Sequence, residues 1–263
     1  MRASDLRPRP LLTGRPLHTY GPLSTLFYDA DRPRASDEEI GWHAQRLPFA
    51  AGTSLELMCG SGRLLVPLLA RGAKIHGVDH SAAMLASCEA RLKAAQLDTP
   101  LFRQDVTQMN LPFRYGSAFA AAGSFQLITD PVAAVAALHH IHAHLVAPGL
   151  LLLDLFVPAE SAQRLAAPLV EVRTVKIADG TQITLRSETT MWTEARLARS
   201  ENRYAHRRGA QRLAEEHATL TLTWYSPEEI TDLVTGADFR DVRIETNAPA
   251  DDGTTRFALS AHI

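Results

Sequence analysis

The sequence predicts an α/β domain in which a doubly wound, mostly parallel sheet is covered by helices on both faces. Three observations support this fold class. From about residue 53, short apolar runs alternate with helical patterns, as in βα units. Residues 150–156 are apolar on both faces, which is typical of a strand inside a parallel sheet. Residues 170–225 instead alternate polar and apolar side chains, which indicates an inserted antiparallel sheet.

The first five strands and their helices follow in order. The expected strands are short apolar runs at residues 53–58, 74–78, 101–104, 118–122 and 150–156. Leucines at helical spacing over residues 64–69 place a helix after the first strand. The helix over 81–95 begins at Ser81, whose hydroxyl can cap its first turn. A helix over 131–146 ends before Pro148-Gly149, because proline and glycine stop helices.

The rest of the chain completes a seven-stranded sheet. Residues 170–225 are expected to form about four antiparallel strands. Ser226-Pro227 then opens a helix with proline at its first position. The last two strands, 241–246 and 255–263, have no helix between them, so they form an antiparallel hairpin and make the sheet mixed. The predicted division is an N-terminal arm (1–40), a core (41–157 and 226–263) and an inserted lid (158–225).

Composition and charge narrow the function classes. The chain has 263 residues, a net charge of −2 and a pI near 6.6, whereas nucleic-acid-binding domains carry basic patches and a high pI. No apolar stretch approaches the ~20 residues that span a membrane. Two cysteines, Cys59 and Cys88, form no disulfide framework. His140 and His144 lie one helical turn apart, but without a third ligand no metal site is expected. We therefore expect a cytoplasmic protein that binds neither nucleic acid nor membrane.

A glycine-containing segment ends the first predicted strand, at the sheet edge where α/β folds bind ligands. Gly60 and Gly62 allow a tight turn and a close approach to a ligand, and Asp79 ends the second strand, where a carboxylate can accept the hydroxyls of a ribose. A dinucleotide site has the same outline but needs a third glycine at position 65, where this chain has leucine. Glu56 would repel a pyrophosphate and attract a ligand that carries sulfonium and ammonium charges.

These motifs resemble those of the class I S-adenosylmethionine-dependent methyltransferases over about residues 20–263, which implies a Rossmann-like fold. Residues 56–62 resemble the family's acidic, glycine-rich motif, although Met58 stands at the first glycine. Residues 78–85, 104–106, 122–126 and 145–149 resemble the motifs and turn that follow. The resemblance implies that Asp79 binds the ribose, and that Asp105 and the Val106 amide bind the adenine. The full set of implied cofactor contacts is Tyr28, Glu56, Met58, Gly60, Gly62, Arg63, Asp79, His80, Met84, Asp105, Val106, Gly123 and Ser124.

The N-terminal stretch 20–29 resembles relatives that act on small amines, sugars and natural products, in which a tyrosine-bearing segment folds over the cofactor. This resemblance makes Tyr20 and Tyr28 candidates to cover the cofactor or touch the acceptor, unless they only pack in a helix. The expected acceptor contacts are Tyr20, Phe125, Gln126, Trp192, Tyr204 and Trp224. The candidate general bases are Tyr28, His206 and Tyr225, needed only if the acceptor must lose a proton.

The sequence therefore predicts methyl transfer from S-adenosylmethionine to a nitrogen or oxygen of a small organic molecule, a specialised metabolite of natural-product biosynthesis, with S-adenosylhomocysteine as product. The protein is expected to be a monomer or a homodimer. The alternatives are a catalytically silent relative that binds the cofactor as a regulator or partner, a methyltransferase acting on macromolecules, and a nicotinamide-dependent oxidoreductase. Glu56 and Leu65 argue against the last of these.

Overall fold

A computed structural model describes residues 20–49, 52–163, 167–246 and 255–263. A seven-stranded sheet has the order β10-β11-β5-β4-β1-β2-β3, in which β11 runs antiparallel to both of its neighbours. The other pairs are parallel. The strands are β1 (Ser54–Leu57), β2 (Ile75–Asp79), β3 (Leu101–Arg103), β4 (Tyr115–Ala120), β5 (Leu145–Val157), β10 (Arg240–Glu245) and β11 (Thr255–His262). The predicted mixed sheet is confirmed.

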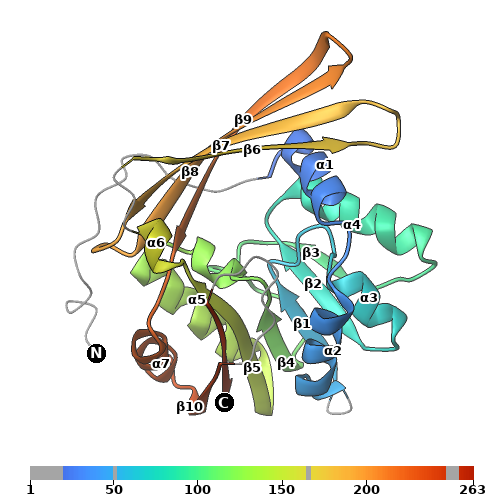
Figure 1. The fold of residues 1–263 in the computed structure, drawn as a ribbon. Coiled ribbons are helices and arrows are strands. Elements are labelled where there is room, and N and C mark those ends of the chain that lie inside the picture. Colours follow the sequence, from blue (N-terminus) through green and yellow to red (C-terminus); the bar gives the residue numbers. More distant parts are fainter. Residues whose placement is uncertain (1–19, 50–51, 164–166, 247–254) are drawn as a thin grey trace.

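Helices cover both faces of this sheet (Figure 1). One apolar cluster packs α5 (Pro131–His144) and α7 (Pro227–Thr235) against one face. The other cluster joins α2 (Asp37–Arg46), α3 (Leu65–Ala70) and α4 (Ala82–Ala94) to the opposite face. The remaining helices are α1 (Pro22–Asp31), the short α6 (Glu160–Gln163) and the 3-10 turn η3 (Ser124–Leu127). No helix in the described ranges is long and apolar enough to cross a membrane.

Several predicted boundaries shift by one to three residues, as in β4, predicted at 118–122, and the junction between α5 and β5 shifts most. The helix α5 ends at His144 rather than at residue 146, and β5 begins at Leu145 rather than at residue 150. Leu145 is buried and pairs with Tyr115, and the register then shifts before Leu150 pairs with Ser117. Tertiary pairing thus extends the strand through a segment that the proline and glycine suggested was a turn.

The insertion forms a separate antiparallel sheet, which we call the lid. Its strands are β6 (Leu169–Lys176), β7 (Gln182–Trp192), β8 (Leu197–Arg208) and β9 (Gln211–Thr223), paired in chain order. The lid lies over the carboxyl ends of the parallel strands (Figure 1). One end is fixed to α1 by an apolar cluster that includes Phe27 and Tyr204. The other end is fixed by Gln126, whose amide donates to the backbone carbonyls of Phe156 and Thr223.

Candidate active site

The glycine loop connects β1 to α3 with three residues in the left-handed region. Met58, Gly60 and Gly62 have φ values of 54°, 56° and 76°. Met58, at the position of the family's first glycine, therefore adopts the conformation that favours glycine there. A Cβ on Gly60 would meet only the Met84 sulfur at 3.8 Å, whereas a Cβ on Gly62 would lie 2.6 Å from the Cys88 sulfur. Gly60 thus leaves room for a ligand, while Gly62 allows close packing.

Asp79 holds this loop against the start of α4. One carboxylate oxygen accepts from the Gly60 N–H at 2.9 Å, and the other accepts from the Ser81 N–H at 2.8 Å. Ser81 caps α4 by accepting from the Met84 N–H, and His80 lies beside Asp79 with Nδ1 3.8 Å from its carboxylate. A carboxylate oxygen can accept more than one hydrogen bond, so both oxygens of Asp79 retain capacity for ligand hydroxyls.

Glu56 is a buried carboxylate beside the loop. It is 4% exposed, and its Oε2 makes no hydrogen bond. Burial raises the pKa of Glu56 to about 8, and the nearby Arg63 guanidinium opposes that rise only in part. A carboxylate without a partner in a dry environment is costly, so its ionised form is suited to receive a cation.

Two further charge pairs are buried near Glu56. Arg63 donates to both carboxylate oxygens of Glu39 on α2, at 2.5 and 2.6 Å. Burial alone would lower the pKa of Arg63, but the hydrogen bonds with Glu39 raise it. On β5, Asp154 lies 3.6 Å from Arg256. The sheet register places Asp154 on the same face as Glu56, because Glu56, Phe119 and Leu152 form one row and Asp154 is two residues beyond Leu152.

Asp154 also organises the loop that follows β4. Its carboxylate accepts from the Ala122 N–H at 2.8 Å, and its backbone oxygen accepts from the Gly123 N–H at 3.0 Å. Burial raises the pKa of Asp154 to about 6, although the hydrogen bond from Ala122 and the charge of Arg256 each lower it. The other oxygen, Oδ1, has no hydrogen-bond partner. Ser124 donates to the Ala121 carbonyl at 2.7 Å, which closes the turn.

The N-terminal tyrosines lie beside the loop. The Tyr20 carbonyl accepts from the Ser81 hydroxyl at 2.8 Å, and its ring is 5.7 Å from that of Tyr28. Burial raises the pKa of Tyr20, and the Tyr28 side chain interacts with Arg63. Glu216 of the lid accepts from the first amides of α1 at 2.8 and 3.2 Å. The lid therefore holds α1 where these tyrosines adjoin Asp79 and Arg63.

The third motif follows β3 at the same edge of the sheet. One Asp105 oxygen accepts from the Thr107 N–H at 2.9 Å and from the Thr107 hydroxyl at 2.8 Å. Val106 is buried in the core that α5 and α7 cover. The roles of Asp105 and Val106 toward an adenine ring stay predictions.

Several residues predicted to contact the acceptor or to act as general bases pack against other elements rather than beside the glycine loop. Tyr204 packs edge-on against Phe27 of α1, 5.5 Å between ring centroids. Trp224 is buried, and Tyr225 packs in the core with Phe125.

Strand alternation puts Trp192 on the outer face of the lid, and the His206 ring contacts the Thr181 hydroxyl at 2.6 Å near the hairpin end. Gln126 is fully buried with its amide bonded to backbone. Tyr204, Trp224 and Tyr225 thus pack against α1 or the core in this structure, and their roles toward an acceptor stay predictions.

Glu39 was not identified as a site residue from the sequence, and Asp154 was not assigned a role in the site. Glu39 is the third residue of a helix capped by Ser36, a position where an acid is normally solvated, so the sequence carried no sign of its burial. Asp154 did leave a sign, because it is the single charge within the apolar run 150–156.

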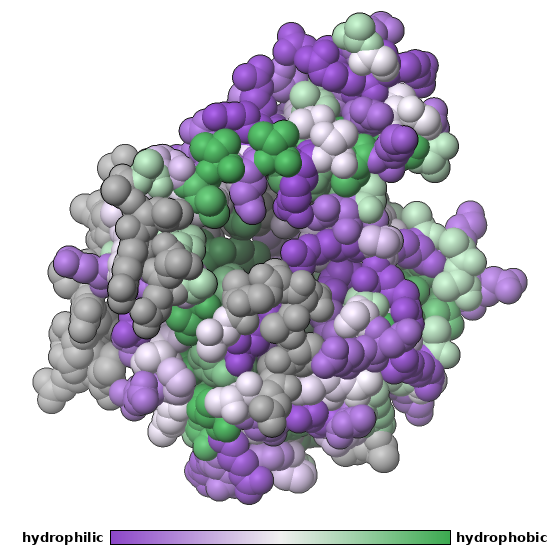
Figure 2. Space-filling view, in the orientation of Figure 1, coloured by the Kyte–Doolittle hydropathy of each residue, from purple (hydrophilic) through white to green (hydrophobic). Residues whose placement is uncertain are grey.

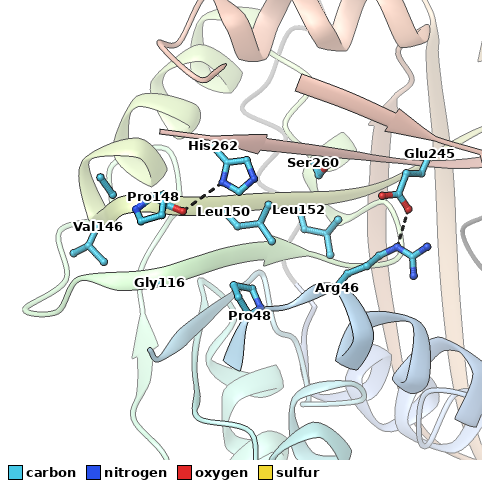
Figure 3. Close-up of a pocket in the computed structure, with 11 residues that line it drawn as sticks. Arg46, Pro48, Gly116, Val146, Pro148, Leu150, Leu152, Glu245, Ser260 and His262 are labelled. Atoms are coloured by element: carbon cyan, nitrogen blue, oxygen red, sulfur yellow. Dashed lines mark hydrogen bonds and ion pairs between the residues drawn. The ribbon is translucent and has the colours of Figure 1, made fainter. Parts of the chain in front are cut away.

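A separate cavity of about 430 Å³ lies at the amino ends of the parallel strands (Figure 3). Its rim includes Arg46 paired with Glu245 at 2.8 Å, and His262, which lies 3.3 Å from the Pro148 carbonyl. Gly116, at the start of β4, lines its floor. The glycine loop lies at the opposite edge of the sheet, so this cavity does not belong to the site.

Comparisons with known proteins agree with the observed fold, and one match includes the glycine loop. Residues 55–149 match the family described as a methyltransferase domain. No curated protein matches the chain. Among solved structures, an S-adenosylmethionine-dependent methyltransferase from Clostridium acetobutylicum has a TM-score of 0.72 at 16% identity, covering 90% of this chain and 96% of that one.

Two methyltransferases named for sugar substrates are also similar in structure. The sugar N-methyltransferase KedS8 from a Streptoalloteichus species has a TM-score of 0.73 at 20% identity, covering 95% of this chain and 94% of its own. The amino pentose methyltransferase CalS10 from Micromonospora echinaspora has a TM-score of 0.67 at 20% identity, covering 90% and 96%. The chain has a Rossmann-like methyltransferase fold, and its residues 55–149 match the methyltransferase-domain family.

Proposed function

We propose that this protein transfers a methyl group from S-adenosylmethionine to a nitrogen or oxygen of a small organic molecule, such as a specialised metabolite. One observation carries the proposal: the open space over Gly60 adjoins a buried carboxylate, Glu56, that has a free oxygen. A ligand that fits this arrangement carries positive charge and approaches the backbone closely.

The buried charges fit this cofactor better than a dinucleotide. Four buried carboxyl groups (Glu39, Glu56, Asp79 and Asp154) accompany two guanidinium groups (Arg63 and Arg256). The excess of carboxyl groups, with Glu56 ionising when a cation binds, suits the ammonium and sulfonium charges of S-adenosylmethionine and opposes a pyrophosphate. Leu65, where the dinucleotide motif needs glycine, is fully buried.

The residues around the glycine loop would bind different parts of S-adenosylmethionine. Glu56 is suited to the ammonium group and Asp79 to the ribose hydroxyls, while Tyr28 on α1 and Tyr20 just before α1 are suited to cover the cofactor. The cofactor supplies an electrophilic methyl group on a positively charged sulfur. The chain supplies orientation and exclusion of water. Of the candidate bases, Tyr28 alone adjoins the loop, and a neutral amine acceptor needs no base.

Two observations support a small-molecule acceptor: the position of the lid and the names of the related structures. A lid fixed at both ends leaves room for a small molecule more readily than for a nucleic acid or a folded protein. Two related structures are named for methylation of a sugar and of an amino pentose, which are small molecules. A cytoplasmic location and a monomer or homodimer remain our expectations.

Two measurements test the proposal. Calorimetric titration of cofactor-free protein with S-adenosylmethionine and with NADH should give binding of the first alone. Formation of S-adenosylhomocysteine should then depend on adding an acceptor from a panel of amines, amino sugars and phenols. Binding of NADH in place of S-adenosylmethionine would refute the proposal. Binding without turnover on any acceptor would favour the catalytically silent alternative.

A further inference from the structure

The helix α1 begins without a capping side chain of its own. Its N-cap residue is Gly21, which has no side chain that could accept a hydrogen bond from the first turn. The lid supplies the missing acceptor, because the Glu216 carboxylate accepts from the Leu23 N–H at 2.8 Å and from the Ser24 N–H at 3.2 Å. A carboxylate is favourable at this place, since the N-terminal end of a helix carries partial positive charge.

Gly21 leaves the space that this carboxylate occupies. A Cβ at position 21 would lie 2.6 Å from one Glu216 oxygen and 2.8 Å from the other, which is too close for atoms that are not bonded. The backbone of Gly21 does not itself require glycine, because its φ is −85°. The glycine is therefore explained by Glu216, and we call this pair of residues the Gly21–Glu216 contact.

The Gly21–Glu216 contact lies next to the residues that adjoin the glycine loop. Tyr20 directly precedes Gly21, and its carbonyl accepts from the Ser81 hydroxyl at 2.8 Å. The Ser81 N–H in turn donates to Asp79 at 2.8 Å. A short series of hydrogen bonds thus runs from the lid through the start of α1 to the carboxylate that is suited to the ribose of the cofactor.

The remainder of α1 is held by other contacts. Its middle packs through Phe27 on Tyr204 of the lid, and its last turn is held to α4 by Asp29, which pairs with Arg91 at 2.6 Å. The helix lies between the lid and α4 (Figure 1). Figure 2 shows the lid standing above the core with a largely hydrophilic visible surface. Glu216 is therefore the lid residue that holds the first turn of α1, where Tyr20 enters the site.

We propose that Glu216 is a positioning residue for cofactor binding. From the lid it fixes the first turn of α1, which keeps Tyr20 beside Asp79 and slows the dissociation of S-adenosylmethionine. Glu216 acts through α1 and does not itself touch the cofactor. Because linkage is reciprocal, a bound cofactor in turn holds α1 against the lid. The inference rests on the proposed methyltransferase function and adds to it a residue that controls how long the cofactor stays bound.

Three variants and their combination test this role. Glu216→Ala removes both acceptor oxygens, whereas Gly21→Ala displaces the carboxylate without removing it. Glu215→Ala is the matched control, because Glu215 is the neighbouring residue on β9 and lies on the opposite face, where it pairs with Arg203 and Arg212. The affinity for S-adenosylmethionine, its dissociation rate and the melting temperature are measured for each protein.

We expect Glu216→Ala to raise the dissociation rate of S-adenosylmethionine about three- to tenfold, because the first turn of α1 loses its cap. Gly21→Ala should have a similar effect, and the double variant should be no worse than Glu216→Ala, since both substitutions break the same contact. Glu215→Ala should leave the rate unchanged. Additive effects of Gly21→Ala and Glu216→Ala would overturn the proposal, and so would an equal effect of Glu215→Ala.

Gly21→Ser in the Glu216→Ala background separates positioning from helix stability. Serine is a favourable N-cap residue, and its Cβ no longer meets a carboxylate in this background. The melting temperature should recover, but the dissociation rate should stay raised, because serine caps α1 without tying it to the lid. Recovery of both would mean that Glu216 only stabilises the helix, which would overturn the proposal. Failure of the wild-type protein to bind S-adenosylmethionine would instead overturn the proposed function.

Discussion

Glu56→Gln is the sharpest test of the buried charge beside the glycine loop. The substitution keeps the size of the side chain and removes its ability to ionise. Burial raises the pKa of Glu56 from 4.5 to about 8. The native protein without ligand therefore holds a proton at Glu56 between these values, whereas the unfolded chain has released it.

The sign and size of the effect follow from that difference. Because the native state binds the extra proton, the stability of the wild type falls as pH rises from about 4.5 to about 8, by about 1.4 kcal/mol per pH unit. Over the whole interval this amounts to about 5 kcal/mol. Burial also raises the pKa of Asp154, to about 6, so the interval from pH 6 to 8 lies mostly above its titration, and contributions that both proteins share cancel in their difference. There the stability gap between Glu56→Gln and the wild type should widen by about 3 kcal/mol.

Urea denaturation of cofactor-free protein at several pH values, followed by circular dichroism, measures this gap. A cationic ligand should reverse the preference, because it stabilises the ionised carboxylate. Wild-type protein should then release a proton when S-adenosylmethionine binds at pH 7, seen by calorimetry in buffers of different ionisation enthalpy. Glu56→Gln should bind at least about tenfold more weakly, without proton release. Parallel pH profiles for the two proteins would refute the assigned burial of this charge.

Four further substitutions test other parts of the site. Asp79→Ala should weaken S-adenosylmethionine binding by about 1.5–3 kcal/mol in calorimetry; unchanged affinity in a folded variant would remove Asp79 from the site. Gly60→Val should abolish binding in a protein whose circular dichroism is native, because the side chain would fill the open space; near-normal binding would mean that the loop is misplaced. Glu39→Gln should lower the free energy of unfolding by about 3–5 kcal/mol, since Arg63 would stay buried without its counter-charge; a loss below about 1 kcal/mol would contradict this. Tyr204→Ala should lower the melting temperature and weaken cofactor binding through α1, whereas Tyr204→Phe should do neither; an effect confined to the acceptor KM would restore Tyr204 as an acceptor contact.

The sequence predicted the sheet because its signals are local. Apolar runs, the Ser81 cap and the helix-free final pair each specify an element within a few residues, and the structure has each of them. The glycine loop could also be predicted from the sequence, since left-handed conformations and close packing restrict the residue type at single positions. Asp79 followed from its place at the end of the second strand.

The orientation of the lid could not be predicted from such local signals. Alternation predicted its strands, but alternation alone does not say which face is turned inward. That depends on long-range contacts such as Tyr204 with Phe27 and Glu216 with the start of α1. Large aromatic side chains were therefore assigned to the acceptor, although they gain more by filling the junctions between elements.

The glycine loop and the lid differ in how their positions are determined. The loop residues are fixed by backbone hydrogen bonds to Asp79 and Asp154, which tie neighbouring strands together. The lid is tied to the rest of the described chain at both ends, by Tyr204 on α1 and by Gln126 at Thr223. Between these anchors, Ser187 and Asn202 are each 8% exposed, although alternation alone does not say which face of their strands is turned inward. Long-range contacts at the anchors therefore decide which lid side chains are turned toward the core.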